Sequence, residues 1–199
     1  DLLKELFIED IIPKGNLDDV KTDSKSKATS VWFTEPKFTL LYEKFINNLD
    51  VMLKDTITAT KQKALVVVHE LASARMAHRL RLLQMLVNKL GDPERRVASA
   101  ALHRLRLLSR SHSELAESLV EETERYLHRV GLADRALQYG LCFLNHFVLS
   151  AKHATLAERL VRIYCAFFRA AAKRGEPSRR LLAALLCGLR RALPYAPRT

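Results

Sequence analysis

Residues 86–108 constrain the fold of this chain more than any other stretch. They read LVNKLGDPERRVASAALHRLRLL, which is an apolar helix end, a Gly-Asp-Pro break and a second apolar helix. We expect Gly91 to close the first helix in the left-handed conformation, Asp92 to cap the second, and Pro93 to suit its first turn. Aliphatic and small residues recur at helical spacing along one face of the second helix, at Val97, Ala100, Ala101, Leu105 and Leu108. This pattern is typical of a HEAT-type helical repeat.

The pattern recurs elsewhere at offsets of 37, 39 and 45 residues, which suit helix pairs rather than strands. A small residue returns where the two helices of each pair would touch, at Ala64, Ala101, Gly140 and Ala184. The sequence therefore predicts an all-α fold, an α-solenoid of HEAT/armadillo-like helix pairs. The expected pairs are 35–54 with 57–73, 75–90 with 93–110, 113–130 with 133–150, and 154–174 with 177–193.

Three segments are expected along the chain. Residues 1–13 are predicted to form a short N-terminal helix, 14–34 a polar connector, and 35–199 a helical-repeat segment. Because the chain starts at Asp1 and the apolar pattern runs to its end without a polar capping helix, we expect a piece of a larger protein. The leucines of the last helix exceed what one neighbour can cover, so further helices of the full-length chain are expected to pack there. No apolar run approaches the roughly 18 residues of a membrane span, so no membrane partner is expected.

Positive charge is concentrated in the repeat segment. Residues 1–30 carry a net charge of −2 and residues 31–199 a net charge of +13, most of it from arginine, which engages phosphate in a bidentate way. One hypothesis is an RNA-binding stripe that contacts phosphates. The candidate residues lie on one face of the helix after Gly91 and at the end of the last helix: Arg96, His103, Arg106, Arg110, Arg190 and Arg191. The alternative is a solvated helix face whose arginine content reflects a GC-rich gene.

Catalytic residues and cofactor or metal sites are not predicted. The three cysteines, Cys142, Cys165 and Cys187, lie in separate apolar helices without zinc-ligand spacing, which indicates reduced and packed thiols. His146 lies one turn from Cys142, but two neighbours on a core-facing helix explain the pair better than a catalytic dyad does. The seven histidines form no metal-binding motif, and there is no glycine-rich phosphate loop. The sequence therefore does not indicate an enzyme.

Six segments in order resemble the CCAAT-binding-factor and nucleolar complex protein family. They are LKELFIEDIIP (Leu3–Pro13), TKQKALVVVHELA (Thr60–Ala72), VNKLGDP (Val87–Pro93), QYGLCFLNHFVLS (Gln138–Ser150), YCAFFR (Tyr164–Arg169) and LLCGLRRALPY (Leu185–Tyr195). The resemblance covers nearly the whole chain and is weakest across 14–34 and 74–80.

This resemblance implies a helical-repeat scaffold that assembles the large (60S) ribosomal subunit in the nucleolus. It also implies pre-ribosomal RNA and large-subunit precursor particles as partners, together with a heterodimeric partner nucleolar complex protein. The family name records a second role, transcriptional regulation at CCAAT promoters. The sequence shows no helix or ribbon built to read the major groove, so that role ranks below ribosome assembly.

Overall fold

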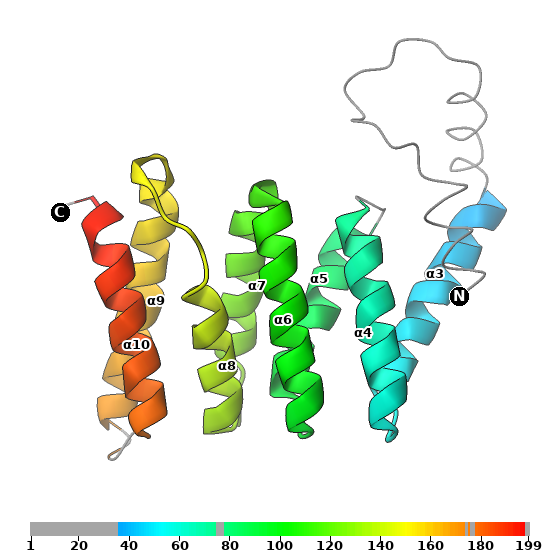
Figure 1. Cartoon of the computed structure of the whole chain (residues 1–199), viewed down its shortest axis with the longest axis horizontal. Coiled ribbons are helices and arrows are strands. Elements are labelled where there is room, and N and C mark those ends of the chain that lie inside the picture. Colours follow the sequence, from blue (N-terminus) through cyan, green and yellow to red (C-terminus); the bar gives the residue numbers. More distant parts are fainter. Residues whose placement is uncertain (1–35, 75–77, 174, 176–177, 198–199) are drawn as a thin grey trace, which may run out of the picture. The chain divides into compact units, whose positions relative to one another are not determined.

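The computed structural model describes residues 36–197 except 75–77, 174 and 176–177 (Figure 1). The helix expected over 1–13 and the connector over 14–34 lie outside these residues. Within them the regular structure is entirely helical, with no strand, which confirms the predicted all-α class. The chain divides into two compact units, residues 1–82 and 83–199, which are considered separately.

In the first unit, α3 (Pro36–Leu53) packs against α4 (Thr58–Ser73). The first turn of α5 (Arg79–Asn88) also belongs to this unit. α3 buries the face that carries Tyr42, Ile46, Leu49 and Leu53, as expected for apolar residues three and four apart. The two helices match the expected pair 35–54 and 57–73 to within one or two residues, the usual uncertainty of helix ends.

The described part of the second unit contains the rest of α5, followed by five longer helices and several short 3-10 turns. The elements are η2 (Lys89–Gly91), α6 (Arg95–Ser111), η3 (Ser113–Leu115), α7 (Ala116–Leu127), α8 (Asp134–Leu144), η4 (Ala151–His153), α9 (Ala154–Lys173), α10 (Arg179–Ala192) and η5 (Leu193–Tyr195). α6, α8 and α10 pack in succession to form one layer, and α7 packs against α9 in the other (Figure 1). α6 and α8 are neighbours that run in the same direction, as stacked helix pairs require (Figure 1).

The predicted core face of α6 is confirmed, because Val97, Ala101 and Leu105 are fully buried. The small residues also lie where helices meet, since Ala64 and Ala184 are buried with Ala101. Gly140 is buried as well, and a Cβ there would press on the side chains of Leu127 and Tyr126. These small residues therefore allow the close helix contacts that the repeat pattern predicts.

The break between α5 and α6 forms where it was expected, but Gly91 acts differently. Its φ is not positive, and it ends the 3-10 turn η2. A side chain is excluded there because a Cβ would lie 2.6 Å from the hydroxyl oxygen of Tyr126. Asp92 does not cap α6 as expected, because the residue before the helix is Glu94 and Pro93 lies outside the first turn. Asp92 is buried, and its Oδ1 accepts a hydrogen bond of 3.0 Å from the backbone N–H of Glu94 in the turn that leads into α6. Asp55 plays the same part before α4, since its Oδ1 accepts from the N–H of Ile57 at 3.2 Å.

The helix predicted over 133–150 is wrong in its last third, because α8 ends at Leu144. Two 3-10-type bonds follow, from the N–H of His146 to Phe143 O and from the N–H of Phe147 to Leu144 O. The side chain of Asn145 donates to Ala184 O of α10 at 2.8 Å, so tertiary contacts hold this end of α8. No described helix is both long enough and apolar enough to cross a membrane.

Candidate nucleic-acid interface

The two helix layers of the second unit differ sharply in charge. α6, α8 and α10, here called the basic layer, contain ten arginines and one acidic residue, Asp134. α7 and α9 contain five glutamates and five lysines or arginines. Since layers built on the same apolar periodicity differ in this way, burial alone does not explain the arginines of the basic layer.

Ion pairing follows the same division. On α7, Arg125 binds Glu121 at 2.6 Å and Glu122 at 2.8 Å. Arg159 on α9 binds Glu124 on α7 at 2.7 Å. No arginine of the basic layer forms an ion pair with any acid in the described part of the chain. Arg135 and Arg191 donate to backbone carbonyl oxygens instead, and the exposed arginines of the layer remain available to an external anion.

The residues predicted to bind RNA lie in this layer, with different degrees of exposure. Arg96, His103 and Arg110 are exposed on α6, and Arg190 is exposed near the end of α10. Arg106 is half-buried, and its Nε is enclosed without a hydrogen-bond partner among the described residues. Burial lowers the pKa of the Arg106 guanidinium, and the charge of Arg110 lowers it further.

The charges of three arginines from two helices act on one histidine, His146, just after α8. The guanidinium of Arg191 donates to the carbonyl oxygen of Phe147 at 3.3 Å, which brings the end of α10 to the loop after α8. Burial lowers the pKa of the adjacent His146, and the charges of Arg106, Arg110 and Arg191 lower it further. The imidazole is therefore mostly neutral at pH 7. We call these four residues the arginine cluster.

Sequence reasoning did not assign His146 to this cluster. A usable signal was present, because Arg106 precedes Cys142 and Arg110 precedes His146 by the same 36 residues, about one repeat. Arg106 also influences the pKa of Cys142, in agreement with that register, although burial is the larger effect. Within the described ranges, no hydrogen bond or ion pair joins the remaining predicted residues to the cluster: Arg96, His103 and Arg190.

The cysteines do not form a reactive site in the described part of the chain. Burial raises the pKa of the Cys142 thiol, which keeps it protonated and poorly nucleophilic. No hydrogen bond links it to His146. The expectation that all three thiols are packed is wrong for Cys187, which is exposed, because its position on α10 faces away from the neighbouring helices. Across the residues described, no group of three potential ligands comes together to hold a metal.

The arrangement suits phosphates rather than bases. Arginine binds phosphate oxygens through two parallel N–H groups, and a row of such groups follows a nucleic-acid backbone. Base stacking needs exposed aromatic rings, whereas Tyr139 in the middle of the basic layer is half-buried. Tyr195, in the turn η5 after α10, is 39% exposed. The basic layer therefore favours contact with the phosphate backbone of a nucleic acid over recognition of its base sequence.

Known proteins resemble this chain over most of its length. Residues 36–171 match the family model described as non-SMC mitotic condensation complex subunit 1. The chain is 34% identical to human CCAAT/enhancer-binding protein zeta over 98% of its length and 20% of that protein. It is 29% identical to nucleolar complex protein 1 of Drosophila melanogaster over 90% of the chain and 15% of the relative. It is 27% identical to ribosome biogenesis protein NOC1 of Chaetomium thermophilum over 83% of the chain and 19% of the relative. The chain thus spans about a fifth of the length of these curated relatives or less.

Proposed function

The chain belongs to the family of non-SMC mitotic condensation complex subunit 1 and is homologous to CCAAT/enhancer-binding protein zeta and nucleolar complex protein 1, and on this premise we propose that it is a helical-repeat scaffold of ribosome biogenesis. It acts in the nucleolus, in assembly of the large ribosomal subunit, and has no catalytic role. The basic layer holds pre-ribosomal RNA in precursor particles through its phosphates. The relatives named for the nucleolar complex and for ribosome biogenesis support this proposal.

The charge difference between the two layers is the observation that supports RNA contact. Ten arginines without an acidic partner in the described residues, set against a neutral opposite layer, create a field that attracts a polyanion to one face. Helical-repeat scaffolds bind partners along such extended surfaces. The opposite layer is then free for proteins, among which we place the heterodimeric partner nucleolar complex protein.

We also propose that further helices of the full-length chain pack on α10. Leu186 and Leu193, at the end of the described helices, are 55% and 56% exposed, and Phe168 of α9 is 39% exposed. An exposed apolar helix face at the end of a repeat array is ordinarily covered by the next repeat.

The proposal is tested by recovering the protein from nuclear extract on a density gradient, with and without RNase. We expect it to sediment with large-subunit precursors, and to move to light fractions after RNase. A variant with Arg110 and Arg191 changed to Gln should leave the particles more readily at high salt. The control variant, Arg162→Gln with Arg169→Gln, removes two exposed arginines from α9. Light sedimentation of the parent protein, with no precursor RNA attached, would contradict the proposal.

A second candidate function is a DNA-associated adaptor. The name of the human relative refers to CCAAT-enhancer binding, and the family description refers to a mitotic condensation complex. A phosphate-binding surface without base readout would serve DNA only through its backbone or through other proteins. Release of the protein by DNase but not by RNase, together with crosslinking at CCAAT promoters, would favour this candidate over the first.

A further inference from the structure

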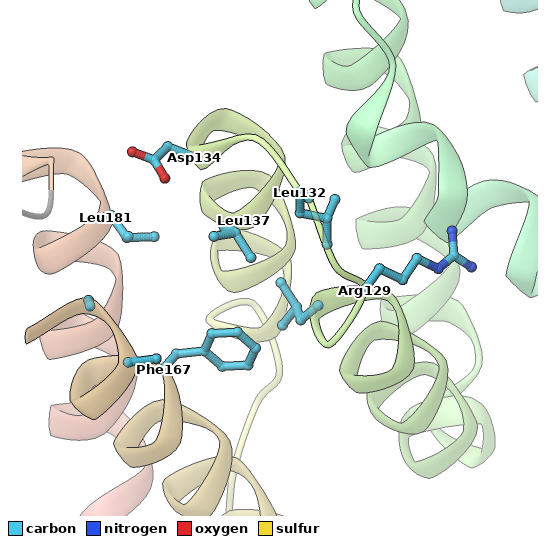
Figure 2. Close-up of a pocket in the computed structure, with 10 residues that line it drawn as sticks. Arg129, Leu132, Asp134, Leu137, Phe167 and Leu181 are labelled. Carbon is cyan, nitrogen blue, oxygen red and sulfur yellow. The ribbon is translucent and has the colours of Figure 1, made fainter. Parts of the chain in front are cut away.

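A pocket of about 500 Å³ lies at the end of the second unit opposite the arginine cluster (Figure 2). It is bounded by the end of α7, the loop that leads to α8, the start of α8, the end of α9 and the start of α10. Leu127, Leu132, Leu137, Phe167 and Leu181 supply the larger apolar side chains. The ring of Phe167 points into the space, toward the side chains of Leu137 and Leu132 (Figure 2).

The pocket exists because small residues lie between the large ones. Ala170 and Ala171 of α9 face it, and so does Gly131, whose φ of 79° suits glycine. These three residues leave volume that larger side chains would fill. At the other end of α10, Gly188 lies directly against Tyr164 and Asn145, so the same helices close together there. The space is therefore a feature of one end of the last two repeats.

The lining points to a protein side chain rather than to a reacting substrate. Most of it is apolar, and the charged members are Arg129 and Asp134. The guanidinium of Arg129 lies 5.5 Å from the ring centre of Tyr126 and extends away from the pocket, whereas the carboxylate of Asp134 extends from the start of α8 toward the side of α10 (Figure 2). The volume falls within the range of about 300–1,000 Å³ typical of binding pockets, and it can take more than one apolar side chain. Val130, in the bounding loop, is fully exposed and extends the apolar surface outward.

Charge around the pocket selects the kind of partner. Exposed basic residues lie within two positions of the lining residues in the sequence, at Lys173, Arg179 and Arg180. Asp134 is the one acid that lines the pocket among the residues described. An apolar anchor surrounded by acidic residues would complement both the pocket and its surroundings.

We infer that this pocket docks an acidic, amphipathic helical segment of a partner protein, with apolar side chains at positions i and i+3 or i+4 inserted beside Phe167. An amphipathic helix laid on an apolar recess is a recurrent mode of peptide recognition. This site lies at the opposite ends of α8 and α10 from the arginine cluster, and the basic residues beside it, Arg179 and Arg180, belong to the basic layer. It gives the chain a second contact, with protein.

The test uses the whole chain and a phage-displayed peptide library as the probe. We expect selection to converge on peptides with apolar residues at helical spacing and acidic residues around them. Ala170→Trp places a large ring in the pocket and should weaken binding of the selected peptide by about tenfold or more. The control, Ala166→Trp, adds the same ring to an exposed site one turn earlier on α9, outside the lining, and should bind as the parent does.

Two further variants separate this site from the arginine cluster. Changing Arg179 and Arg180 together to Gln should weaken peptide binding, whereas Arg110→Gln with Arg191→Gln should not. No convergence in the library, equal binding by the two tryptophan variants when both give the parent circular dichroism spectrum, or equal loss of peptide binding in the two arginine variants would each overturn the inference. None of these results depends on whether the protein joins ribosomal precursors.

Discussion

The hydroxyl of Tyr164 on α9 donates a hydrogen bond of 2.7 Å to Oδ1 of Asn145, the residue that ends α8. The amide of the same Asn145 donates to the carbonyl oxygen of Ala184 on α10 at 2.8 Å. Three helices are therefore joined through one side chain, and Gly188 beside it allows α10 to approach. The arginine cluster begins at the next residue, His146, so this contact fixes the position of the cluster.

We expect Tyr164→Phe to lower the free energy of unfolding by about 1–3 kcal/mol, because Oδ1 of Asn145 loses its donor in a largely buried site. The measurement is urea denaturation followed by circular dichroism. Tyr139→Phe is the matched control, since the Tyr139 hydroxyl makes no hydrogen bond to any described residue and should change stability little. Equal effects of the two substitutions would show that the Tyr164 hydroxyl does not hold the helices together.

The core face of α6 gives a second stability prediction. Ala101→Leu should cost about 1–3 kcal/mol, because Ala101 is fully buried and the added atoms have no space. Leu105→Ala should cost about 2–5 kcal/mol through the cavity that it leaves. Leu186→Ala serves as a control at a leucine that is 55% exposed, and it should melt close to the parent. Parent-like thermal melting of both α6 variants would mean that this face is not the core.

RNA affinity should depend on salt through the arginine cluster. Each phosphate contact removed should reduce the magnitude of the slope of log affinity against log salt by about 0.7–0.9. Arg110→Gln with Arg191→Gln should therefore lower the slope for unrelated structured RNAs alike, and Arg96→Gln should lower it again. Arg162→Gln with Arg169→Gln, on α9, should leave it nearly unchanged. Fluorescence anisotropy across a salt series measures the slope, and identical slopes for the two double variants would refute the assignment of the face.

The pH dependence of stability should contain a contribution from His146. Its pKa in the folded chain lies below the value of about 6.5 expected when unfolded, because burial and three arginines disfavour the imidazolium. The unfolded chain thus binds the proton first, so the contribution is fully present above about pH 6.5 and is lost as the pH falls through the folded pKa.

His146→Gln should therefore lose less stability than the parent between neutral and mildly acidic pH. Urea midpoints of the two proteins in parallel buffers measure this difference, and the six other histidines are common to both. If acid destabilises the variant as much as the parent, His146 keeps an ordinary pKa in the folded chain.

Local periodicity was sufficient to predict the helices and their buried faces. Val97, Ala101 and Leu105 could be assigned to the core because residues three and four apart share one side of a helix wherever that helix lies. Asp55 and Asp92 could be aligned across repeats, and both accept a backbone N–H two residues later. The charge of each helix also follows directly from its sequence.

Contacts between helices determined the features that helical periodicity in the sequence did not predict. Gly91 was expected to need a positive φ, yet it is the Tyr126 hydroxyl, 35 residues away in sequence, that excludes a side chain there. α8 ends at Leu144, and the side chain of the following residue, Asn145, bonds to α9 and α10. In the same way, His146 joins Arg106, Arg110 and Arg191 only when three helices lie side by side. Helical periodicity is a property of neighbours along the chain, whereas the cluster and the pocket depend on distances between segments that the sequence does not encode locally.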